Sequence, residues 1–265
     1  LLHPPVEAAV PPADGRRVAP QRSRLLSGFG LALLNDAADE TAVSLYFGQH
    51  VSHNHFDRLH FDLFARGQPL TPDLGYPDAM NIFVPGVWTW SVNTIAHNTV
   101  VVDAAAQPGN APGVVELFAD AGWVRGIEVS ADDTYPQCDD YRRGLLLVDA
   151  PGGGKYLVDC FNVSGGRQQD YSLHGPPGTV RFADDAWSAP APGTLAGEHV
   201  RLGELYDNPE MAAKGEVEGY YEYRGSGFQH LFNVQRRTAG DAVVDYVHEK
   251  DPTAALRIRV LAAPG

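Results

Sequence analysis

The sequence predicts an all-β protein, an antiparallel β-sandwich of about twelve strands. Short runs rich in Val, Leu, Phe and Tyr alternate apolar with polar residues, which is the period of a strand with one solvated face. The 28 glycines and 20 prolines punctuate these runs at regular intervals, and almost no segment has helical periodicity. This combination is typical of two packed antiparallel sheets.

The chain opens with the Pro-rich stretch 1–25, which we expect to be an irregular linker before a β-sandwich domain over 26–265. Since it lacks an initial Met and a signal-peptide pattern, we expect the chain to begin inside a longer polypeptide. The Gly-rich stretch 151–155 predicts a hairpin turn between two strands. The expected strands are 30–35, 42–48, 58–67, 98–103, 122–130, 141–150, 155–163, 178–185, 217–224, 228–237, 242–250 and 255–262.

Composition narrows the classes of ligand. With 44% hydrophobic residues the chain is of ordinary globular character, and its length is ample for a large core. The net charge of −13 argues against nucleic acid as the main partner, and an anionic substrate would need a local basic or metal-centred field. No apolar run approaches the ~18 residues of a membrane helix, so no membrane partner is expected. The two cysteines, Cys138 and Cys160, are interpreted as unrelated, mostly buried thiols.

A histidine cluster is the strongest chemical signal. On a regular strand His53, His55 and Asp57 would share one face, and imidazole with carboxylate is a typical zinc ligand set. Asp73, on an expected return strand, and His97, just before an apolar strand, are the candidates for completing the site. A His-x-His pair alone is weak evidence, because both histidines can bind metal or one can face a cleft instead.

Three further residues have less specific readings. His60 alternates with apolar neighbours and is interpreted as a hydrogen-bonded structural histidine. Trp88 and Trp90 are more typical of a core than of a carbohydrate platform, although the Gly/Pro-rich loop that carries them lies between the two halves of the histidine cluster.

The stretch HNHFDRLHFDLFARGQPLTPDLGY followed by WSVNTIAHNTVVVDAAAQ resembles the C-terminal β-sandwich module of the heparinase II/III-like polysaccharide lyases, which include heparinases and oligoalginate lyases. The resemblance runs from about residue 28 to beyond 180 and is tightest over 51–107. The combined pattern H-x-H-x-D, D-x-G-Y and A-H-N-T-V-x-V-D is much more specific than any of its parts. The stretch 159–178, with His174, also fits the family.

The resemblance implies a two-part lyase in which an N-terminal α/α-toroid, absent from this chain, carries the main catalytic residues. It implies that His53 faces the cleft and acts in catalysis. It implies that Zn²⁺ is the cofactor, bound by His55, Asp73 and His97. We further expect the cleft to be lined by substrate contacts from Tyr76, His174, Trp88 and Trp90.

The implied reaction is β-elimination on a uronate-containing polysaccharide or oligosaccharide by a secreted or periplasmic enzyme. The C5 proton of a uronate is only weakly acidic, so the adjacent carboxylate must be neutralised and a base and an acid positioned. One departure is the stretch 91–94 (SVNT), where many relatives have a basic residue for the substrate carboxylate.

Two alternatives remain at this point. The first is a non-catalytic, zinc-stabilised carbohydrate-binding or assembly β-sandwich. The second, a zinc hydrolase, is disfavoured because the sequence has no H-E-x-x-H.

Overall fold

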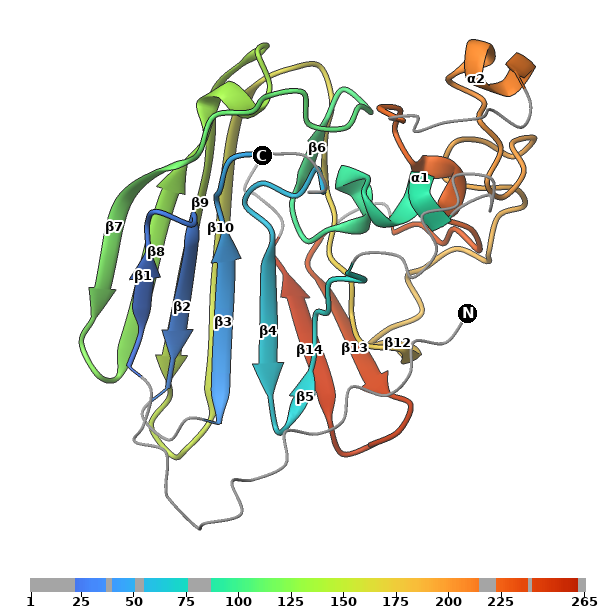
Figure 1. Cartoon of the computed structure of the whole chain (residues 1–265). Coiled ribbons are helices and arrows are strands. Elements are labelled where there is room, and N and C mark those ends of the chain that lie inside the picture. Colours follow the sequence, from blue (N-terminus) through green and yellow to red (C-terminus); the bar gives the residue numbers. More distant parts are fainter. Residues whose placement is uncertain are drawn as a thin grey trace, which may run out of the picture.

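The computed structural model describes residues 22–36, 40–50, 55–75, 87–214, 223–237 and 240–261. The described part is all-β, as predicted, and its two longest helices have five and six residues. Figure 1 shows the strands arranged as antiparallel sheets, with the short helices α1 (Val87–Ser91) and α2 (Pro209–Lys214) at one side. None of the helices in the described ranges has the length and apolar character that a membrane crossing requires.

Two sheets form the sandwich, and their strands follow the predicted alternation. In β3, Thr41, Val43 and Leu45 are buried and the residues between them are half-buried. Hairpin neighbours pair within each sheet, in the orders β1-β2-β3-β4-β5 and β10-β9-β8-β7. The first sheet contains β1 (Arg24–Leu26), β2 (Leu31–Asn35), β3 (Thr41–Tyr46), β4 (Phe61–Ala65) and β5 (Gln68–Pro69). The second contains β7 (Val114–Asp120), β8 (Val124–Ser130), β9 (Cys138–Asp149) and β10 (Lys155–Gly165).

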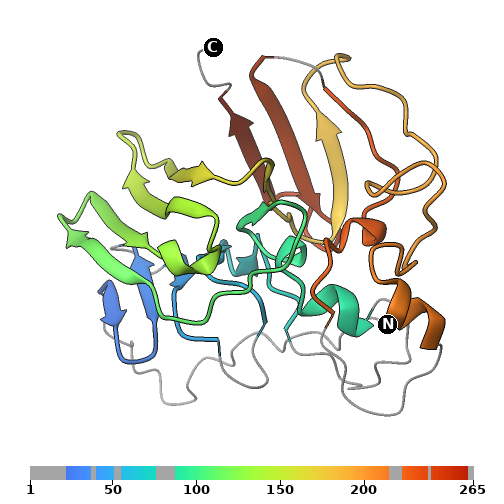
Figure 2. The same ribbon diagram turned by 90° about the horizontal axis from the view of Figure 1, so that it is seen from above.

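The two sheets lie one over the other (Figure 2). The core lies between them, where apolar side chains of both inner faces meet. Leu34, Leu45, Ile127 and Leu145 are each at most 1% exposed. The β9–β10 hairpin closes at 151–154 as predicted, with Gly152 and Gly153 at positive φ. Burial of this apolar surface is the main force that holds the two sheets together.

The remaining elements lie beside the sandwich (Figure 2). A third sheet has the order β12-β13-β14, and a two-stranded one pairs β11 with β6. Their bounds are β6 (Val100–Val102), β11 (Gln169–Tyr171), β12 (Gly178–Phe182), β13 (Ala242–His248) and β14 (Ala255–Val260). The helices are α1 (Val87–Ser91), η1 (Thr94–Ala96), η2 (Asp132–Thr134), α2 (Pro209–Lys214) and η3 (Phe228–His230).

Several local predictions were wrong. Residues 228–237 form η3 and a loop instead of a strand, and β1 and β7 were not foreseen. Residues 58–60 precede β4 as a turn with Leu59 at φ 61°, so no regular strand carries His55 and Asp57. Asp73 lies in an irregular segment after β5, not on a return strand. The expected strand 217–224 falls largely outside the described residues.

Both cysteines are free thiols, as predicted, but only Cys138 is buried. The expected burial was wrong for Cys160, which is exposed on β10.

Candidate metal centre

His97 is positioned by a short capped helix. The Asn93 side chain accepts the Ile95 N–H at the start of η1, and the His97 N–H closes the helix on the Thr94 carbonyl. The Nδ1 atom of His97 lies 2.8 Å from the Asn93 carbonyl oxygen, which only accepts hydrogen bonds, so Nδ1 carries the proton. The Nε2 atom of this buried ring therefore has the lone pair that could bind a metal ion.

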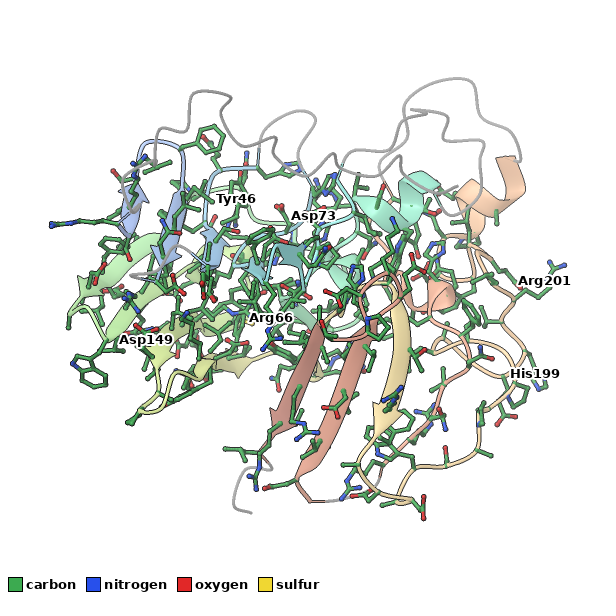
Figure 3. The ribbon with its side chains drawn as sticks, turned by 90° about the horizontal axis from the view of Figure 1, so that it is seen from below. Tyr46, Arg66, Asp73, Asp149, His199 and Arg201 are labelled. Carbon is green, nitrogen blue, oxygen red and sulfur yellow. The ribbon has the colours of Figure 1, made fainter. Side chains whose placement is uncertain are left out.

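His55 and Asp73 face that lone pair. His55 Nδ1 lies 2.9 Å from His97 Nε2 and 3.7 Å from Asp73 Oδ1, and His97 Nε2 lies 3.5 Å from Asp73 Oδ2. The three residues come from three separate segments, the loop before β4, the segment after β5 and the end of η1. In Figure 3 Asp73 lies near the centre of the molecule, between the strands of the five-stranded sheet and helix α1.

The protonation states suit a cation. Burial lowers the pKa of His97 to about 3 and also lowers that of His55, against the attraction of Asp73. Burial alone would raise the pKa of Asp73, but the facing imidazoles and the Gly75 N–H outweigh it and hold the pKa below its usual value. Two neutral imidazoles and a carboxylate therefore meet at neutral pH.

This donor set fits a divalent metal ion of the kind that takes imidazole and carboxylate ligands. Tetrahedral coordination at about 2.0–2.2 Å places donor atoms about 3.3 Å apart, close to the separations found here. A metal-binding histidine also typically donates its second ring N–H to a carbonyl, as His97 does to Asn93. The predicted trio is thus brought together, which is a grouping that could hold a metal ion.

Asp57 is a fourth member that the ligand prediction did not include. One ligand atom from each of His55, Asp57, Asp73 and His97 lies within 4.8 Å of the others. Burial, together with the nearby Asp73 charge, raises the pKa of Asp57 to about 7 against the attraction of His60. The H-x-H-x-D pattern was the signal that could have identified it.

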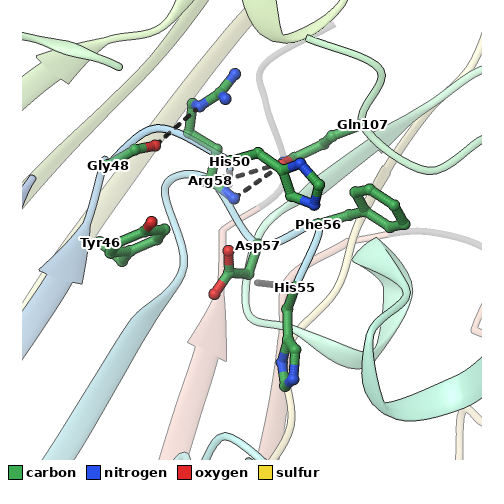
Figure 4. A pocket seen from close by; sticks show the side chains of 8 residues that line it. All are labelled: Tyr46, Gly48, His50, His55, Phe56, Asp57, Arg58 and Gln107. Atoms are coloured by element: carbon green, nitrogen blue, oxygen red, sulfur yellow. Dashed lines mark hydrogen bonds between the residues drawn. The ribbon is translucent and has the colours of Figure 1, made fainter. Parts of the chain in front are cut away.

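A pocket opens beside the cluster, and Figure 4 shows the Asp57 carboxyl between Tyr46 and His55. The rings of His50 and Phe56 lie together at its rim. The pocket is lined by Tyr46, Gly48, His50, His55, Phe56, Asp57, Arg58 and Gln107.

His60 is the predicted hydrogen-bonded structural histidine, and it supports the cluster. Its Nδ1 accepts the Asn98 N–H at 2.8 Å, so its Nε2 donates to Asp62 Oδ1 at 3.1 Å. Asp62 Oδ1 also accepts the Asp73 N–H at 2.9 Å. This chain of hydrogen bonds fixes the backbone of Asp73 next to His55 and His97.

Arg143 holds the same region from the sandwich side. It is fully buried, pairs with Asp159 and donates to the carbonyls of Leu59 and Asn98. These carbonyls belong to the residues next to His60 and His97. The guanidinium also lies 4.5 Å from the centroid of the Phe61 ring. Sequence reasoning missed Arg143, because a charged residue on a strand usually faces solvent.

His174 and Trp90 lie close to one another near the cluster. The ring Nε2 of His174 lies 2.8 Å from the Ile95 carbonyl oxygen. The backbone N–H of His174 donates to Asn98 Oδ1. Burial lowers the pKa of His174. The Trp90 ring lies 5.6 Å from that of His174 and 5.7 Å from that of His230. Their role as substrate contacts stays a prediction.

Three predicted residues cannot be placed. His53 and Tyr76 lie outside the described residues, and the side chain of Trp88 in α1 is likewise not described.

Known proteins are similar to this chain over the same region. The family model described as Heparinase II/III-like, C-terminal, matches residues 19–149. An alginate lyase of Stenotrophomonas maltophilia is 28% identical over 161 residues, which is 54% of this chain and 22% of that protein. An exo-oligoalginate lyase of Saccharophagus degradans is 27% identical over 143 residues, 47% of this chain and 19% of that protein.

Solved structures share the fold. A protein described as heparinase III matches 65% of this chain and 27% of its own chain, with a TM-score of 0.53 and 22% identity. The heparan sulfate lyase HepC of Pedobacter heparinus matches 65% of this chain and 28% of its own, with a TM-score of 0.51 and 17% identity. The chain thus spans between about a fifth and a quarter of the length of these relatives.

Proposed function

Because this chain belongs to the heparinase II/III-like superfamily of polysaccharide lyases, we propose that it is the β-sandwich module of an enzyme that cleaves a uronate-containing saccharide by β-elimination. The observation that carries the proposal is the meeting of His55, Asp73 and His97. All three belong to the sequence pattern that resembles the family, and the fold brings them together from separate segments beside a pocket.

The metal in this proposal is zinc. When bound, zinc would tie three loop segments together and supply a positive field near the saccharide. The residues of the chain itself prepare that position. Asn93 orients the His97 ring through Nδ1, and Asp62 holds the backbone N–H of Asp73.

His53 is proposed to face the cleft as a neutraliser of the substrate carboxylate or as a proton donor. It stands two residues before His55 in the H-x-H pair. Tyr76, His174, Trp88 and Trp90 are proposed to line the same cleft. Of these, His174 is connected to the cluster through Asn98, whose N–H is held by His60.

The remaining catalytic groups are assigned to an α/α-toroid region joined to this chain. The cluster supplies ligands and a field but no base paired with an orienting partner, and an open sheet face excludes little water. The names of the relatives point to alginate and to heparan sulfate as substrate classes. The proposed location of the enzyme is secreted or periplasmic.

The activity test compares the chain alone with the chain joined to its helical region. Each is incubated with alginate, heparan sulfate and hyaluronan oligosaccharides, and new ultraviolet absorbance reports the unsaturated product. We expect turnover only from the joined protein. Binding without cleavage by the joined protein would favour a carbohydrate-binding module, and cleavage by the chain alone would contradict the need for a toroid.

The zinc test measures metal content after mild dialysis. We expect about one zinc per chain, and much less in His55→Ala, which should also lose several kcal/mol of stability because binding is coupled to folding. A folded wild-type chain with no bound zinc, even after zinc is added, would contradict the assignment.

The role of His53 is tested by His53→Ala in the joined protein. The variant should keep its zinc and its melting temperature but lose most of its kcat, since it removes a group at the reacting centre. Loss of zinc instead would mean that His53 is a ligand.

A further inference from the structure

The substrate carboxylate needs a cation, and the stretch 91–94 offers none. Two arginines in this part of the structure are committed elsewhere. Arg143 is fully buried against Asp159, and Arg58 is 3% exposed with donors to Gly48, Thr134 and Gly109. Neither guanidinium is placed to meet a saccharide from solvent.

Arg224 supplies a cation at this place from a distant part of the chain. Its exposed side chain lies over the Phe56 ring, 4.4 Å from the ring centroid. Phe56 directly follows His55, and its backbone N–H donates to the Val92 carbonyl at 2.9 Å. The guanidinium therefore lies next to the stretch that lacks a basic residue.

The segment around Arg224 is anchored on both sides. Arg224 Nη1 donates to the Gln107 carbonyl at 3.0 Å, and the Arg224 carbonyl accepts the Ala106 N–H at 3.2 Å. Asn93, which also orients His97, donates through Nδ2 to the Gly225 carbonyl at 2.9 Å. These bonds tie the position of Arg224 to the same residue that positions a predicted metal ligand.

An aromatic surface accompanies the cation. The His50 ring stacks on Phe56 with centroids 4.8 Å apart and planes 22° apart, and both rings line the pocket beside Asp57 (Figure 4). We call Arg224, Phe56 and His50 the Arg224 platform. The planar guanidinium of an exposed arginine matches a carboxylate in its hydrogen-bonding geometry.

We propose that the Arg224 platform binds the carboxylate of a uronate residue next to the metal cluster, so that Arg224 replaces the basic contact missing from residues 91–94. This inference rests on the proposed lyase function. In a chain of net charge −13, a positioned arginine gives an anionic saccharide the local positive field it needs. Arg224 is thus a substrate-binding residue that touches the carboxylate and takes no proton.

The test is Arg224→Gln in the chain joined to its helical region, assayed with a mannuronate tetrasaccharide and a heparan sulfate tetrasaccharide. Loss of a charge-assisted contact made in both ground and transition states should raise KM about tenfold or more and change kcat little. Zinc content should stay at the wild-type level. The KM for the methyl-esterified mannuronate tetrasaccharide should be the same in variant and wild type, because the ester carries no charge.

Arg201→Gln is the matched control, since Arg201 is 88% exposed and lies at the edge of the molecule, away from Asp73 (Figure 3). Arg224→Lys should recover part of the affinity. A KM of Arg224→Gln within twofold of wild type on the cleaved tetrasaccharide would overturn this inference alone. If the wild type cleaves neither tetrasaccharide, the proposed function falls and this inference with it.

Discussion

The sandwich and the three-stranded sheet β12-β13-β14 use similar residues in opposite ways. In the sandwich, Arg143 is fully buried and paired with Asp159. In the other sheet, Arg257 makes a similar pair with Asp245 at 2.7 Å, but its side chain is 73% exposed. The same contrast holds for apolar residues, since Leu145 is 0% exposed and Val260 55%.

This difference shows that the sandwich is the more tightly packed of the two regions. The buried residues of the sandwich fix the loop segments beside it that carry the candidate ligands, and Arg143 reaches the backbone next to two histidines. Of the strands in the third sheet, β12 and β14 are mostly exposed, and no residue of that sheet belongs to the metal cluster in the described part of the chain. Precise geometry at the cluster therefore depends on the sandwich.

The largest difference between the regions is expected when the arginine of each Arg–Asp pair is removed. Arg143→Ala leaves Asp159 without its cationic partner and two carbonyls without their donor, and it should destabilise the protein by about 3–5 kcal/mol, measured by urea unfolding. Zinc affinity should also fall by about tenfold or more, because the backbone beside His97 loses its support. Arg257→Ala should leave both properties unchanged. Equal losses in the two variants would contradict the contrast between the regions.

Truncation of an apolar side chain should also destabilise the sandwich more than the three-stranded sheet, by a smaller amount than the loss of Arg143. Leu145→Ala removes a fully buried side chain and should cost about 2–5 kcal/mol of unfolding free energy, including the cavity it leaves. Val260→Ala, on the exposed sheet, should stay within about 0.5 kcal/mol of wild type. A large loss in Val260→Ala would show that this face is covered in the intact protein.

The smallest effect is a pH dependence from His230 in η3, which belongs to neither sheet. Burial lowers its pKa to about 4, and its Nε2 lies 3.1 Å from Thr89 Oγ1. The unfolded chain takes up the proton near pH 6.5, so stability should fall as pH drops from about 6.5 to about 4. Over this pH range the free energy of unfolding of His230→Gln should fall by up to about 3 kcal/mol less than that of the wild type. Parallel profiles for variant and wild type would refute the assignment.

Much of the candidate site followed from a sequence pattern. The resemblance of the pattern around His55, Asp73 and His97 to a known family named these residues as candidate metal ligands, and the structure brings them together. The reason given from strand geometry was wrong, since His55 and Asp73 both lie in irregular segments. Period-two reasoning cannot foresee a turn such as the one at Leu59.

By itself the sequence determined the all-β class, the β9–β10 hairpin and the kinds of atom that meet at the cluster. Alternation and turn residues are local properties, so they can be read along the chain. Only the tertiary structure decided which nitrogen of His97 faces His55 and Asp73. It also decided that Arg143 is buried beneath the cluster and that Arg224 lies over Phe56. The last two depend on contacts between residues 84 and 168 positions apart, which no local pattern encodes. The first depends on the turn of η1, which brings the Asn93 carbonyl to His97 Nδ1.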